Sequence, residues 1–209
     1  DGTWQVISAD VIREPIAITS IKASRVVITG NNCSYGNTGI SLSSGDRGFT
    51  VSCTTVNTNA TVTVAGGGTN VKIREGMAVS GTGIPDDTTV LALVGTTQFT
   101  MSRAATSSAT NTITFHSFIN DVVVSNNICW NNGQEAGDGF GIYLADVDGF
   151  VVTNNRCMDT RPTKKQTWGI RTFTTADHDR DRSGIIALNN CKGNASGAFS
   201  ESGDGLTGD

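Results

Sequence analysis

The chain has 209 residues, of which 16% are charged and 6% aromatic, and its formal net charge at pH 7 is −4. This length allows one extended domain or a domain with an insert. Scattered Lys and Arg residues and a pI near 5.1 argue against nucleic acid as a partner. No signal peptide and no apolar run of ~18 residues occur, so membrane insertion is not expected.

The five cysteines have no paired spacing and no Cys/His cluster, which argues against a disulfide framework and a zinc site. Free cysteines favour folding in a reducing compartment such as a bacterial cytoplasm. The abrupt start at Asp1 and the glycine-rich stretch Ser202–Asp209 lead us to expect a piece of a longer protein.

Two short motifs recur along the chain. Residues 1–20 resemble one incomplete coil, and residues 21–45 form the first clear one. In this coil a run of β-branched residues is followed by Asn-Asn and a Cys, and the same pattern occurs three more times. The four segments are Val27–Cys33, Val123–Cys129, Phe150–Cys157 and Ile185–Cys191. A Gly-Ile-x-Leu strand or a variant of it begins at Gly39, Gly141, Gly169 and Gly197, and the last two intervals are both 28 residues. A fixed period of ~20–50 residues indicates a solenoid.

The runs are rich in β-branched residues, and no amphipathic helix separates them, so the solenoid is expected to be a parallel β-helix. Equivalent positions would then stack ~4.8 Å apart, which suits an amide ladder at a corner. The expected members of this ladder are Asn31, Asn127, Asn155 and Asn190. Cys33, Cys129 and Cys157 are expected to form a buried stack, with Cys191 slightly out of register.

The repeat breaks in the middle of the chain. From about Arg47 to Phe115, six short segments alternate apolar and polar residues, separated by Gly-rich turns. Such spacing predicts a small antiparallel sandwich or barrel inserted into one turn of the helix. The predicted class is therefore all-β, a right-handed parallel β-helix with an antiparallel insert, divided into first coils at 1–46, the insert at 47–115, and remaining coils and tail at 116–209.

The Asn-Asn-Cys coils resemble the right-handed β-helices of the pectate-lyase-like superfamily, especially those of bacteriophage tailspikes and tail fibres. Gly76–Pro85 and Gly95–Ser102 resemble a β-module of phage virion and tail proteins. The resemblance implies a homotrimer in the phage tail, folded in the host cytoplasm, with other tail proteins as partners. It also implies recognition of bacterial surface polysaccharide, which many such proteins cleave.

The candidate binding surface is an outward row on the Gly-Ile-x-Leu strands. Ile142 and Leu144 should point inward, so Tyr143 should point outward, stacked with Ser41, Arg171 and Phe199. Aromatic rings and guanidinium groups suit sugar rings and carboxylates. The predicted substrate-binding residues are Tyr143, Arg171, Phe173, Lys164 and Lys165. The competing interpretation is a plain solvent-facing strand, with Phe140 and Trp168 packing in the core or at a corner.

A hydrolase would need two carboxylates ~5–9.5 Å apart. Glu135 or Asp138 with Asp146 is the predicted catalytic set. A lyase would instead use Tyr143 or Lys164 as base, with Arg171 to neutralise a uronate.

Two further patterns give little support to a lyase or a metal site. Arg161–Lys165 departs from the Arg-x-Pro-x-x-Arg of pectate lyases, because its Pro comes one residue early and a second Arg is missing. Asp177, His178 and Asp179 lack the spacing of an EF-hand. No metal and no cofactor are therefore predicted. Three classes stay open: a glycan-recognising phage protein, a depolymerase, and a bacterial carbohydrate-binding surface protein.

Overall fold

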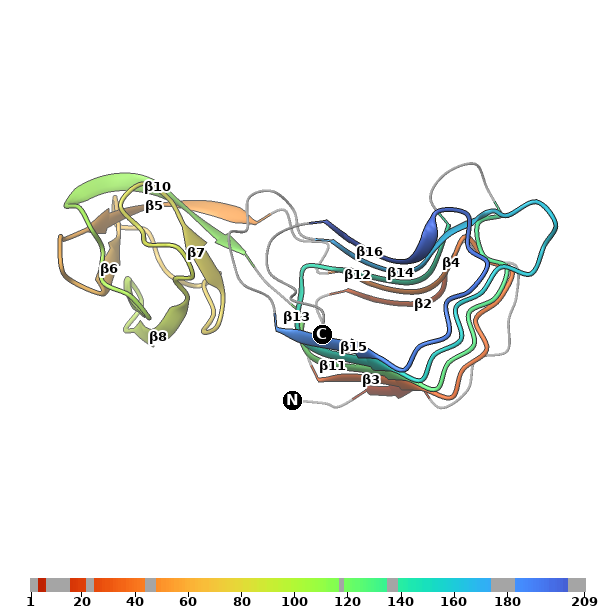
Figure 1. Cartoon of the computed structure of the whole chain (residues 1–209). Coiled ribbons are helices and arrows are strands. Elements are labelled where there is room, and N and C mark those ends of the chain that lie inside the picture. The colour runs from red at the N-terminus through yellow and green to blue at the C-terminus, as the bar shows by residue number, and fades with distance from the viewer. Residues whose placement is uncertain are drawn as a thin grey trace. The chain divides into compact units, whose positions relative to one another are not determined.

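The computed structural model describes residues 4–6, 16–21, 25–43, 48–116, 119–134, 139–173 and 183–202 (Figure 1). Within these ranges the chain is all-β, because every regular element is a strand. The strands form three sheets that belong to two compact units. In this described part, no helix has the length and apolar character that a membrane span requires.

The first unit contains two five-stranded parallel sheets. The spatial order in one sheet is β1 (Trp4–Val6), β3 (Val26–Thr29), β11 (Ile119–Ser125), β13 (Val147–Thr153) and β15 (Gly184–Ala187). In the other it is β16 (Gly197–Ser202), β14 (Gln166–Phe173), β12 (Gly139–Ala145), β4 (Thr38–Ser43) and β2 (Ile16–Ile21). Consecutive strands of this unit alternate between the sheets, so each pair of strands adds one level to both (Figure 1).

One apolar core fills the space between these two sheets. Side chains alternate along a strand, so the inward position of each level comes from every second residue of the β-branched runs. Val124 pairs with Ile28 in the first sheet, and Ile142 pairs with Ile40 in the second; all four are at most 1% exposed and belong to the same cluster.

An amide ladder closes each level at the end of β3, β11, β13 and β15. The Asn127 side-chain oxygen accepts from the backbone N–H and side-chain amide of Asn31, both at 3.0 Å, and Asn155 and Asn189 repeat this pattern in the next levels. The fourth member is Asn189, so the expectation of Asn190 was wrong. The ladder residue lies two positions before each Cys, and Asn190 instead pairs with Arg156 and is exposed.

The cysteine stack runs beside the ladder and includes Cys191, which is therefore in register rather than shifted. Cys33, Cys129, Cys157 and Cys191 are all buried thiols of the same core cluster. Burial, followed by the thiol contacts with Cys129 and Cys191, raises the pKa of Cys157 well above its ordinary value. The four cysteines of the stack are free and packed within the core.

The repeat glycines allow the second sheet to approach these thiols. A Cβ added to Gly141 would lie 2.5 Å from the Gly169 carbonyl oxygen and 2.7 Å from the Cys157 Cβ. At Gly169 it would lie 2.5 Å from the Cys191 Cβ. Gly39, Gly141 and Gly169 of the Gly-Ile-x-Leu motif are thus required by close packing, and none of the three has a positive φ.

A second amide ladder, which the motifs did not reveal, lies at the start of β12, β14 and β16. The Gln166 side-chain oxygen accepts from the Asn132 N–H at 3.1 Å, and its amide donates to Asn194 at 2.8 Å. Asn132 also donates to the Cys33 carbonyl, and Asn194 donates to the Cys157 and Cys191 carbonyls. Backbone groups at this corner are therefore satisfied by side chains.

The second unit is one six-stranded antiparallel sheet with the order β7 (Ala78–Ser80), β10 (Ala109–His116), β5 (Phe49–Thr55), β6 (Thr61–Val64), β9 (Gln98–Met101) and β8 (Val90–Val94). Its two edge strands meet, since the Val90 N–H donates to the Met77 carbonyl at 2.8 Å and the Val79 N–H donates to the Thr88 carbonyl at 2.8 Å. Phe99 and Phe115 pack edge to face at 5.3 Å in its core. The predicted antiparallel strands are present. Of the two predicted forms, sandwich or barrel, the single sheet corresponds to a half-barrel and not to a two-sheet sandwich.

Candidate functional site

Strands β12 and β14 bring Tyr143 and Arg171 side by side on the outer face of the second sheet. The two residues are register partners, and Ser41 is the partner of Tyr143 in β4. Ile142 and Leu144 on either side of Tyr143 are fully buried, whereas Tyr143 is partly exposed. The outward orientation expected from the strand alternation is therefore present.

Phe199 does not extend this row. It pairs with Ile170, while Ser200 is the partner of Arg171. The expectation failed because Gly197 pairs with Trp168 and not with Gly169, so the last level is offset by one residue from the 28-residue spacing. Trp168 lies against Gly197, where an added Cβ would be 2.7 Å from the indole.

The row is instead completed by Phe140 and Phe173. The rings of Phe140 and Tyr143 stack with centroids 5.1 Å apart and an interplanar angle of 17°. The Arg171 guanidinium carbon lies 5.3 Å from the Phe140 centroid and 5.9 Å from that of Phe173. We name these four residues, Phe140, Tyr143, Arg171 and Phe173, the aromatic face.

Sequence patterns assigned Phe140 to packing at the core or a corner. It is only 8% exposed but lies outside the core cluster, because the register shifts at Gly139/Phe140 and Gly141 faces the thiols instead. Tyr143 and Arg171 therefore cover Phe140 from outside. The glycine that follows Phe140 is the one sequence signal that could have indicated this arrangement.

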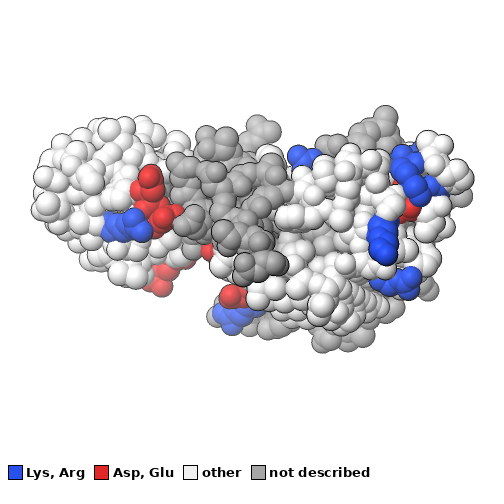
Figure 2. Space-filling model, viewed as in Figure 1, with Lys and Arg blue, Asp and Glu red and all other residues white. Residues whose placement is uncertain are grey.

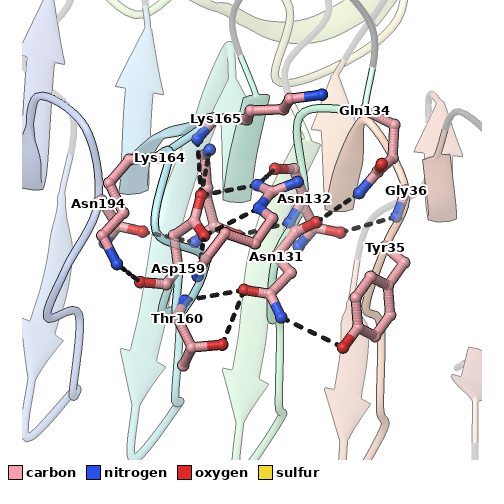
Figure 3. Close-up of polar contacts among 12 residues, drawn as sticks. Tyr35, Gly36, Asn131, Asn132, Gln134, Asp159, Thr160, Lys164, Lys165 and Asn194 are labelled. Carbon is pink, nitrogen blue, oxygen red and sulfur yellow. Dashed lines mark hydrogen bonds and ion pairs between the residues drawn. The ribbon is translucent and has the colours of Figure 1, made fainter.

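Lys164 and Lys165 lie in the connection from β13 to β14, which is fixed by a buried carboxylate (Figure 3). Asp159 is 2% exposed and accepts from the Arg161 side chain, with the shorter ion-pair contact at 2.6 Å. It also accepts from the backbone N–H groups of Lys165 at 2.7 Å and Gln166 at 2.8 Å. The Lys164 ammonium donates to the Asp159 carbonyl at 2.6 Å. Lys164 thus has a structural contact, and Lys165 is exposed just before β14.

The charge of Asp159 contributes to stability in a pH-dependent way. Burial alone would raise the pKa of this carboxyl, but the Arg161 side chain and three backbone N–H groups hold the pKa of Asp159 well below its ordinary value. A lowered pKa in the folded state gives stability that is present above the unfolded pKa and is lost as the pH falls toward the folded pKa.

Replacing Asp159 by Asn is expected to lower the free energy of unfolding by about 1.5 kcal/mol at pH 7, because the new amide would meet N–H donors. The difference from wild type should shrink once the pH falls below about 4, as the wild-type carboxylate loses its advantage. Urea unfolding at a series of pH values measures the stability difference between variant and wild type and its dependence on pH. Asp87→Asn, which removes an exposed contact to Arg103 at 3.9 Å, is the control with little expected effect. A difference that does not vary with pH would contradict this account.

Of the predicted catalytic carboxylates, Asp146 alone lies within the described residues. Asp146 is 4% exposed and follows the last residue of β12, whereas Gly139 begins that strand. Glu135 and Asp138 lie outside the described residues, as do Asp177, His178 and Asp179. A carboxylate pair stays a prediction.

No group of three or more His, Cys, Asp or Glu side chains suited to a metal ion occurs in the described ranges. The aromatic face offers ring stacking, cation–π contact and hydrogen bonding by a guanidinium group. These interactions suit recognition of sugar rings and their acidic substituents.

No protein-family model matches the chain, and no curated protein matches it in sequence. Among solved structures, it is similar to the "Gp54 tailspike of Acinetobacter baumannii bacteriophage AP22 in complex with A. baumannii capsular saccharide", at 14% identity and a TM-score of 0.35. The match covers 95% of this chain and 41% of that chain, so the chain spans less than half the length of that tailspike.

Proposed function

We propose that the chain is a right-handed parallel β-helix of the phage tailspike type that binds bacterial surface polysaccharide. The alternation of strands between two parallel sheets and the stacked Asn and Cys positions support the β-helix. The antiparallel unit, residues 47–115, is then an insert between β4 and β11. The motif resemblance extends the proposal to a homotrimer in a phage tail, in contact with other tail proteins.

The observation that carries the binding proposal is the position of Arg171 between the rings of Phe140 and Phe173. The side chain is held by flat aromatic surfaces, so little conformational freedom would be lost on binding a ligand. Tyr143 offers a partly exposed ring one level away, at a stacking position for a sugar. A guanidinium group beside such a ring can also bind a carboxylate or hydroxyl of the next sugar.

Tyr143→Ala and Arg171→Ala are each expected to weaken binding of a capsular or lipopolysaccharide ligand about tenfold while leaving the melting temperature nearly unchanged. Isothermal titration against polysaccharide from candidate host strains provides the measurement. Thr153→Ala, a partly exposed change on the other parallel sheet, is the matched control. Unaltered affinity in both face variants would contradict the proposal.

Incubation with the same polysaccharides separates recognition from cleavage. Binding without new reducing ends supports a recognition module. New reducing ends would indicate a depolymerase, and a simultaneous rise in the ultraviolet absorbance of unsaturated uronates would identify it as a lyase. Reducing ends alone would indicate hydrolysis and direct mutagenesis to Glu135, Asp138 and Asp146.

A further inference from the structure

Most described cationic side chains of the parallel-sheet unit, all except Arg25 and Arg171, lie where β13 continues into β14 and where β15 ends. Figure 2 shows Lys and Arg side chains clustered at this end of the unit, on the right in the view. Five such residues belong to these connections: Arg156, Arg161, Lys164, Lys165 and Lys192. The whole chain has a formal net charge of −4, so this local excess runs against its overall balance.

The one described carboxylate at this end is already neutralised. Asp159 is buried and paired with Arg161. The other described carboxylates of the unit lie at the opposite end of the strands: Asp121, Asp146 and Asp148 at the start of β11 and β13, and Glu201 beside Thr172 near the end of β14. In the described part of the chain, Arg156, Lys164, Lys165 and Lys192 form no ion pair. Arg156, Lys165 and Lys192 are exposed and can contact a ligand, and the Lys164 ammonium has further donors beside its hydrogen bond to the Asp159 carbonyl.

These cations come from neighbouring levels and lie close together. Arg156 pairs with Asn190 of the next level, and Lys192 follows two residues later in a turn, where it is exposed. The Lys164 ammonium lies 3.6 Å from the position of a Cβ on Gly193, the residue after Lys192. We name Arg156, Lys164, Lys165 and Lys192 the cationic corner.

Aromatic side chains accompany the cationic corner. The Arg156 guanidinium carbon lies 5.3 Å from the centroid of the Trp130 ring, one level away. The contact with the ring orients the guanidinium plane. The N–H groups at the edge of that plane can still donate two parallel hydrogen bonds to one carboxylate. The ring of Tyr35 is 53% exposed, and its hydroxyl accepts from Asn131 at 3.3 Å (Figure 3). Rings beside fixed donors suit a polymer of acidic sugars.

We propose that the cationic corner binds the carboxylate groups of an acidic polysaccharide, as a subsite separate from the aromatic face; this rests on the proposed glycan recognition. Three of these cations lie in the connection from β13 to β14, and Lys192 lies in the next level, ~4.8 Å further along the stack, so together they match a ligand that presents more than one carboxylate along its length. A nucleic acid is the less suitable polyanion, because a pI near 5.1 differs from the strongly basic balance of proteins that bind it.

The test is titration of the full chain with polygalacturonate, with its uncharged methyl ester, and with oligothymidylate. The double variant Arg156→Gln/Lys192→Gln is expected to weaken polygalacturonate binding at least about tenfold, from the loss of two charge-assisted contacts. Binding of the methyl ester should stay unchanged. Wild-type affinity for polygalacturonate should fall between about 50 and about 200 mM NaCl, and less steeply in the variant.

Lys72→Gln is the matched control, because it removes an exposed charge from the other unit. Equal losses in Lys72→Gln and the double variant, no polygalacturonate binding by wild type, or tighter binding of oligothymidylate would each overturn the subsite. A failure of the proposed binding by the aromatic face can be distinguished from this result, since Tyr143→Ala should weaken the binding of the acidic and the esterified polymer alike. Loss confined to Tyr143→Ala would overturn the corner and support the face.

Discussion

Replacing Gly141 by alanine is expected to lower the free energy of unfolding by about 3 kcal/mol, the upper end of overpacking costs, or to prevent folding. The new methyl group would lie 2.5 Å from the Gly169 carbonyl oxygen and 2.7 Å from the Cys157 Cβ. Both neighbours are backbone or near-backbone atoms, so neither can turn aside as the end of a long side chain could. Relief would require separating β12 from β14 or from the thiol stack.

Urea unfolding followed by circular dichroism measures this loss. Gly30→Asn is the matched control, because a Cβ at Gly30 meets nothing within 4 Å and its φ of +72° is close to the +58° of Asn126 and +56° of Asn154 at the equivalent corner. That substitution should change stability little. If Gly141→Ala unfolded at the same urea concentration as wild type, the close approach of the second sheet to the thiols would be incorrect.

Much of the parallel-sheet unit could be predicted because the same packing positions recur in each repeat of the sequence. Val124, Val152 and Ile28 occupy one inward row, and the Asn-Asn-Cys pattern gives the same positions in each level. The ambiguity lies within the Asn-Asn pair, where only the distance to the following Cys distinguishes Asn189 from Asn190. Counting back two residues from each Cys selects Asn189, which the structure shows in the ladder.

The candidate surfaces were harder to predict, because their members are joined by packing rather than by spacing. Phe140 reaches the outer face through a local register shift at a glycine, and no period encodes such a shift. Arg156 and Lys192 are 36 residues apart in sequence but belong to neighbouring levels. The connection from β13 to β14 also contains Asp159, whose contacts with Arg161 and two backbone N–H groups are irregular.

Asn155→Leu is expected to lower the free energy of unfolding by about 3 kcal/mol, since unpaired buried groups cost ~1–3 kcal/mol each. Its oxygen accepts from the backbone N–H of Asn127 at 3.0 Å and from the Asn127 amide at 2.9 Å. Its own amide donates to the Val124 carbonyl at 2.9 Å and to Asn189 at 3.0 Å. Leucine keeps the volume of the side chain and removes all four hydrogen bonds, so the loss reports the polar ladder rather than a cavity.

The comparison of Asn189→Leu with Asn190→Leu tests the register of the same ladder. Asn189 accepts from Asn155 and donates to the Val152 carbonyl at 2.8 Å, whereas Asn190 is exposed and its side chain makes no hydrogen bond within the described residues. Asn189→Leu should therefore destabilise the protein in chemical denaturation, and Asn190→Leu should stay within about 0.5 kcal/mol of wild type. The reverse order would move the ladder by one residue in the last level. The Cys191 thiol would then face outward, and its rate of modification by a thiol reagent in the native protein would rise to that of an exposed cysteine.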